Sequence, residues 1–117
     1  GKLSDNQNID LANGMIHYFT TAETTTSTPN LRFDSSTTLD SKMSIGETIA
    51  VTIITSAAAA GYSAQLTIDG TSINENWVAG EVPTGGGLSG VDIYSYTIIK
   101  IGSGNFTVIA NLTKTSS

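Results

Sequence analysis

The side chains that could carry out chemistry are few in this sequence, and the most versatile of them is its single histidine, His17. A Ser–His–Asp triad or an imidazole-bound zinc ion needs a histidine, so either would have to use this residue. Residues 15–19 around it are an apolar, strand-like segment with no partner at a known spacing. We therefore expect a structural or surface histidine, no catalytic residue and no zinc site.

Acidic side chains could be ligands for calcium or the catalytic carboxylates of a glycoside hydrolase. Calcium takes about six to eight oxygen ligands, usually from closely spaced carboxylates. The densest group is Asp69, Asn74 and Glu75, with Asp92 further along, and its order is not that of an EF-hand loop. Paired carboxylates for glycoside hydrolysis stay open, although no acid has a sequence context typical of a general acid. We expect no metal, no cofactor and no enzyme activity.

Aromatic side chains give the best candidate for ligand binding. Trp77 lies in a loop rich in Gly and Asn, where its ring could stack on a sugar or plug one end of a β-sandwich. The packing role is favoured, because a large aromatic side chain usually buries itself. Tyr62, Tyr94 and Tyr96 could extend either role, and Asn74 precedes the tryptophan. These five residues are the candidate ligand-binding surface.

Composition limits the class of protein. The 117 residues suit one domain, 1–117, with 1–6 expected to be a disordered or linker segment. Only 13% of residues are charged, the net charge is −5, and the five basic residues are scattered, which argues against nucleic acid as a partner. There is no cysteine for a disulfide, and no apolar run approaches the ~20 residues of a membrane span.

Three segments have the alternation of apolar and polar residues that is typical of β-strands. They are 47–55, 92–101 and 105–113, and a tight hairpin at 102–104 is expected to join the last two. Both faces of segment 92–101 are fairly apolar. We therefore expect this strand to be central in its sheet or covered on both sides.

Weaker patterns fill the rest of the chain. Further strands are expected at 8–12, 15–21, 28–34 and 64–68. Asn13-Gly14 is a favoured type I′ hairpin pair, Asp69-Gly70 is another turn signal, and 71–90 is expected to be a loop. No helical period of useful length is present. The sequence thus predicts an all-β fold, a jelly-roll-like β-sandwich of about eight antiparallel strands.

Three motifs in order give a family resemblance. The first is Gly46-Glu47-Thr48 leading into the strand at 49–55, the second is W-x-x-G-x-x-P at 77–83, and the third is D-x-Y-x-Y at 92–96 after a glycine-rich gap. Residues 8–14 and 17–19 also fit the opening strands of the same module. Over about residues 8–112 the chain resembles a module of bacteriophage virion proteins, especially tail fibres and tail spikes.

The resemblance implies a function without catalysis. It implies a jelly-roll-like domain that forms a homotrimer in a tail fibre or similar appendage of the extracellular virion, next to other virion proteins. Trp77, Gly80, Pro83 and Asp92 match its recurrent positions, with architectural roles. Two alternatives stay open: a carbohydrate-binding module or adhesin domain that contacts a host surface glycan, and a capsid decoration protein.

Overall fold

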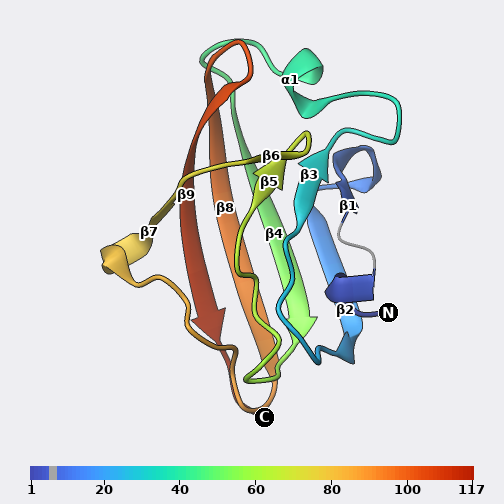
Figure 1. The fold of residues 1–117 in the computed structure, drawn as a ribbon, viewed down its shortest axis with the longest axis vertical. Coiled ribbons are helices and arrows are strands. Elements are labelled where there is room, and N and C mark those ends of the chain that lie inside the picture. Colours follow the sequence, from blue (N-terminus) through green and yellow to red (C-terminus); the bar gives the residue numbers. More distant parts are fainter. Residues whose placement is uncertain (6–7) are drawn as a thin grey trace.

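The strongest alternating segments form one mixed sheet of five strands. The structure, a computed structural model, describes residues 1–5 and 8–117. The strand order is β2-β4-β8-β9-β7, and the long strands β4, β8 and β9 lie side by side in Figure 1. The strands are β2 (Ile16–Ala22), β4 (Thr48–Ser56), β8 (Val91–Gly102), β9 (Asn105–Lys114) and β7 (Glu75–Trp77). β8 is central in this sheet, as its two apolar faces predict.

A second sheet of four short strands packs against the first. Its order is β1-β3-β5-β6, and its strands are β1 (Asn8–Asp10), β3 (Asn30–Arg32), β5 (Thr67–Ile68) and β6 (Thr71–Ser72). In β1 and β3 the middle residues Ile9 and Leu31 are fully buried, so the residues on either side of them point away from the core. The prediction of an all-β fold is therefore confirmed as two packed sheets.

The prediction of antiparallel strands only is wrong. β1 with β3, β3 with β5, β2 with β4 and β7 with β9 are parallel pairs, and β4 with β8, β8 with β9 and β5 with β6 are antiparallel. The reason is that successive strands often lie in different sheets. A strand that returns to a sheet after a crossover can lie parallel to its neighbour, whereas two strands joined by a tight hairpin are antiparallel.

The hairpin predicted at Asn13-Gly14 is also wrong, because β1 and β2 belong to different sheets. A 3-10 turn, η2 (Leu11–Asn13), carries the chain across, with Leu11 buried and Gly14 at φ 121° and ψ 173°. The other two turns are confirmed. Asp69 and Gly70, both at positive φ, join β5 to β6, and Ser103-Gly104 joins β8 to β9.

One hydrophobic core lies between the sheets. The fully buried side chains from the five-stranded sheet are Val51, Ile53, Tyr94, Tyr96, Ile98, Val108 and Ala110, and the other sheet and its loops supply Leu3, Ile9, Leu11, Leu31, Leu39, Met43, Leu66 and Ile68. Lys100 reaches this core from β8. Its ammonium group donates to the carbonyls of Asp40 and Met43 and pairs with the Asp40 carboxylate at 3.0 Å.

The N-terminal segment differs from the linker expected over residues 1–6. Residues Leu3–Asp5 form a 3-10 turn, η1, and Leu3 is 1% exposed in the core. The buried carboxylate of Glu23 accepts hydrogen bonds from the amides of Leu3 and Ser4, which fixes the turn. Residue 6 of the predicted linker lies outside the described residues.

Helical structure is short. The α-helix α1 (Leu39–Lys42) is capped by Thr38, whose hydroxyl accepts from the Ser41 amide. The segment 71–90, expected to be a loop, contains β6, β7 and the 3-10 turn η3 (Val78–Gly80). Within residues 1–5 and 8–117, no helix is long and apolar enough to cross a bilayer.

Candidate functional site

Two of the five residues predicted to form a ligand-binding surface lie in the core. Tyr94 and Tyr96 are 0% and 1% exposed, and their rings stack with centroids 6.5 Å apart. The Ser63 amide donates to the Tyr94 hydroxyl at 2.9 Å, and the Ser63 hydroxyl lies 3.2 Å from that of Tyr96. Burial raises the pKa of Tyr94 to about 12. Both rings are therefore structural and have no access to a surface ligand.

Trp77 is half-buried at the end of β7. Its ring meets Tyr96 edge to face, with centroids 6.5 Å apart, and packs against the core. Tyr62 is half-buried, while Asn74 is exposed just before β7. Since Tyr94 and Tyr96 have no exposed surface, the five residues do not form one ligand-binding face.

His17 lies on β2 with its Nε2 2.9 Å from the carbonyl oxygen of Gly14. A carbonyl can only accept, so Nε2 carries the proton and donates this bond. Neither a carboxylate nor a hydroxyl forms a hydrogen bond with the ring in the part of the chain that the structure describes. The ring thus has a local structural role there.

The acidic residues considered for calcium point to separate places. Asp69 accepts from the amides of Leu39 and Asp40, and buried Asp92 accepts from the Gly87 amide. Glu75 accepts from the Leu66 amide at 2.7 Å. Over the described ranges, no group of three or more His, Asp or Glu side chains is placed to hold a metal ion.

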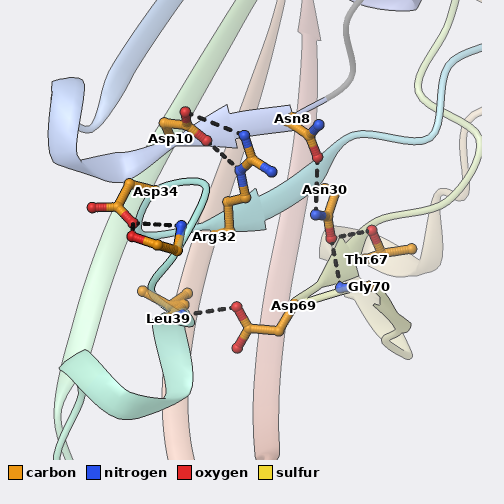
Figure 2. Close-up of polar contacts among 10 residues, drawn as sticks. Asn8, Asp10, Asn30, Arg32, Asp34, Leu39, Thr67, Asp69 and Gly70 are labelled. Atoms are coloured by element: carbon orange, nitrogen blue, oxygen red, sulfur yellow. Dashed lines mark hydrogen bonds and ion pairs between the residues drawn. The ribbon is translucent and has the colours of Figure 1, made fainter.

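A polar hollow of about 380 Å³ lies on the outer side of the four-stranded sheet. We use "polar hollow" for the depression lined by Asn30 and Arg32 of β3, residues 34–38 and the Asp69-Gly70 turn. Figure 2 shows Asn30, Arg32, Asp34, Asp69 and Gly70 of this lining together with Asn8 and Asp10 of β1. Because Leu31 points into the core, Asn30 and Arg32 on either side of it point outward into this depression.

Most polar groups around the hollow hold the structure together. Arg32 pairs with Asp10 at 2.6 Å, and Asn30 bridges Asn8, Thr67 and the Gly70 amide (Figure 2). Sequence reasoning missed this site because its contacts join segments that are 22 to 40 residues apart. The available signals were the only arginine and the turn-forming run at 34–37.

The other distinctive surface is the side of the five-stranded sheet that faces away from the core. We call it the outer face. Its members follow from strand alternation and register: Ile16 and Tyr18 of β2; Thr48, Ala50, Thr52 and Ile54 of β4; Ile93, Ser95, Thr97 and Ile99 of β8; Thr107, Ile109, Asn111 and Thr113 of β9; and Asn76 of β7. None of these side chains is charged, and every one is apolar or carries only a hydroxyl or amide.

Large apolar groups are exposed on the outer face. Ile16 is 69% exposed, Tyr18 59% and Ile109 43%. Tyr18 lies beside Ile54 in the register, and Ile54 lies beside Ile93. Tyr18, Ile54 and Ile93 therefore form an apolar row across three strands, which is unusual for a surface in contact with water alone.

Comparisons with family models, with curated proteins and with solved structures find no match for this chain. The resemblance to phage virion proteins therefore stays a prediction. The polar hollow and the outer face are the two surfaces of the described residues that could contact a ligand or a partner.

Proposed function

We propose that this chain is a structural module that assembles with copies of itself through the outer face. In the terms of the resemblance, it is a jelly-roll-like β-sandwich and a homotrimeric subunit of a phage tail fibre or similar virion appendage, without enzyme activity. The observation that carries the proposal is the absence of any charged side chain from the outer face of the described strands.

The outer face is large enough for a stable contact. At ~3.4 Å per residue and ~4.8 Å between strands, its five strands cover roughly 700 Å² in projection. A stable interface buries about 800 Å² of accessible surface on each partner, and a corrugated sheet has more accessible surface than its projection. The face therefore matches the area that one copy must bury against others.

Charge also favours a second copy as the occupant. Each chain carries a net charge of −5, which makes copies repel one another wherever acidic groups meet. An interface through the outer face buries no charge and keeps the acidic side chains in solvent, where salt screens them. A polyanion such as nucleic acid would find no basic side chain on this face to pair with.

The edge strand β2 gives independent support. It is a seven-residue strand at one side of the sheet, and it contains no Pro and no Lys, Arg, Asp or Glu. Edge strands of monomeric proteins usually carry such residues, which prevent pairing with other chains. Assembly through the adjoining outer face would protect this edge.

The residues that carry the resemblance have surroundings that suit architectural roles. Trp77 packs on the core, and Gly80 adopts φ 70°, a conformation that favours glycine. Asp92 is fully buried at the start of β8, where its carboxylate accepts from the amide of Gly87 and so ties the glycine-rich gap to the strand. These contacts support the virion-module proposal.

Sedimentation velocity over a range of concentrations tests the proposal with two matched variants. Ser95→Lys places a charge at the centre of the outer face, and Ser72→Lys makes the same change at an exposed position of β6 in the other sheet. We expect the parent chain and Ser72→Lys to form the same oligomer. Ser95→Lys should be a folded monomer, with its fold checked by circular dichroism.

The outcomes separate the alternatives. A trimer that Ser95→Lys dissociates supports the appendage subunit, and a dimer with the same sensitivity supports assembly but contradicts the trimeric fibre. A chain that stays monomeric at every concentration overturns self-assembly and favours a decoration protein, whose partner is a capsid surface. Dissociation by both variants also contradicts the assignment to the outer face.

A further inference from the structure

A second surface has unused binding capacity, and it lies on the opposite side of the molecule from the outer face. The polar hollow opens on the outer side of the four-stranded sheet, whereas the outer face belongs to the other sheet. Its volume of about 380 Å³ falls within the ~300–1,000 Å³ typical of small-molecule sites. A ligand here would not compete with assembly.

Several polar groups of the hollow are already committed to the fold. Both carboxylate oxygens of Asp69 accept backbone amides at the start of α1, at 2.7 and 3.0 Å. The Asn30 side chain donates to Asn8 and accepts from Thr67 and Gly70. Asp69 and Asn30 therefore form walls of the hollow, and recognition of a ligand has to come from other residues of its lining.

The Arg32 guanidinium has a hydrogen-bond donor that no group among the described residues uses. Its Nε and Nη2 face the two oxygens of Asp10, at 2.6 and 3.5 Å. Among the described residues, no group accepts a hydrogen bond from Nη1. The hydrogen bond to Asp10 raises the pKa of Arg32, and the charge of nearby Asp34 adds to that rise. The guanidinium is therefore charged, held in place and able to donate to a ligand.

Asp34 supplies the complementary acceptor. Its Oδ1 accepts from the amide of Ser36 at 2.9 Å and from the Ser36 hydroxyl at 3.2 Å (Figure 2). The hydrogen bond from the Ser36 amide, helped by Thr37, lowers the pKa of Asp34. An ionised carboxylate accepts about four hydrogen bonds, so Asp34 keeps accepting capacity on Oδ2. Its turn is fixed by the backbone bridge to Thr37.

A donor and an acceptor held close together match a hydroxyl-rich ligand, because each hydroxyl both donates and accepts. Because both side chains are already fixed by the fold, binding orders few additional groups. The charges near the hollow are one guanidinium and the carboxylates of Asp10, Asp34 and Asp69, so an anion is disfavoured. We propose that the polar hollow binds a neutral saccharide, with Arg32 donating to and Asp34 accepting from neighbouring hydroxyls.

The affinity should be low. The hollow has no aromatic side chain in its lining on which a sugar ring could stack. Hydrogen bonds at an open, wetted site give little net free energy, because the ligand exchanges bonds with water for bonds with protein. We expect dissociation constants of about 1 mM for a single sugar residue, which corresponds to about −4 kcal/mol.

Two-dimensional ¹H–¹⁵N NMR titration is suited to that range. The probes are glucose, galactose, mannose and N-acetylglucosamine, with sulfate as the anionic comparison. At least one sugar should shift the amides of residues 34–38 and leave the amides of β8 unchanged. Asp34→Asn keeps the acceptor for Ser36 and replaces Oδ2 with a donor, so it should weaken binding about tenfold or more. Asp5→Asn, an exposed aspartate at the N-terminus, is the matched control.

The proposal is overturned if no sugar shifts the amides of residues 34–38, or if Asp34→Asn and Asp5→Asn bind alike. It is also overturned if sulfate produces the same shifts as the sugars. Shifts centred on the Trp77 indole and lost in Trp77→Phe would place the sugar on the aromatic side chain instead. Because Ser95→Lys changes only the opposite surface, it should bind sugar normally, which separates this test from that of assembly.

Discussion

Glu75 should make the protein less stable as the pH rises, the reverse of the usual behaviour of a stabilising carboxylate. Its Oε1 accepts from the Leu66 amide, but its Oε2 is buried and has no hydrogen-bond partner among the described residues. Burial raises the pKa of Glu75, and the bond from Leu66 opposes that rise only in part. The folded protein therefore holds this proton more tightly than the unfolded chain does.

The sign of the pH dependence follows from linkage. Below the ordinary pKa of a glutamate, the side chain is neutral in both states and burial carries no charge penalty. As the pH rises from there through the raised folded pKa, the unfolded chain binds fewer protons than the folded protein, so the free energy of unfolding falls. The penalty is fully present once the pH lies above the raised pKa of Glu75 in the folded protein.

Glu75→Gln removes that charge and keeps the acceptor for the Leu66 amide. The neutral amide removes the cost of burying a charge, although its Nε2 takes the place of the unpartnered Oε2, so we expect a net gain of about 1 kcal/mol at this half-buried position. A gain of about 1 kcal/mol corresponds to roughly 3–5 °C in Tm for a domain of this size. Thermal melts at pH 7 and pH 4 measure it, with exposed Glu81→Gln as the matched control.

The variant should gain stability at pH 7 and lose that gain at pH 4, while Glu81→Gln stays near the parent at both. A Glu75→Gln protein that is less stable than the parent at pH 7 would refute the reasoning. The same holds for a difference from the parent that does not change between the two pH values. Using the difference between variant and parent removes the contribution of all other acids.

Two more substitutions test the buried contacts. Tyr94→Phe leaves the amide of buried Ser63 without its acceptor, so urea unfolding should show a loss of about 1–3 kcal/mol. At a concentration where the chain is monomeric, Tyr18→Phe, which is exposed in the single chain, should change stability by less than about 0.5 kcal/mol. Gly61→Ala puts a methyl group into the side chain and backbone of Glu23, and unfolding should show a loss of about 1–3 kcal/mol. Equal stability of either core variant and the parent would contradict the packing described here.

The long strands could be predicted because each has many alternating residues. The ends of β4, β8 and β9 lie within one residue of the ends of the predicted strands 47–55, 92–101 and 105–113. Strands of two or three residues, such as β5 and β6, are too short to show a period. The helix α1 depends on Asp69, some 30 residues away, which no local pattern reveals.

The candidate site was harder to predict than the fold. Alternation groups Tyr94 with Tyr96 on one face of β8, but the opposite face is also apolar, so the sequence does not say which one faces the core. The polar hollow needs β1 beside β3, and local signals instead favoured a hairpin at Asn13-Gly14. Arg32 acquires its partner Asp10 only when that non-local pairing forms, whereas Asp34 is bonded locally to Ser36.

Protection of the outer face in solution tests self-assembly most directly. The chain has no cysteine, so Ser95→Cys and Ser72→Cys each create a single thiol on an exposed strand position. At concentrations where the chain assembles, thiol labelling of Ser95→Cys should be at least about tenfold slower than that of Ser72→Cys, and dilution should remove the difference. Equal labelling rates at every concentration would contradict assembly through the outer face.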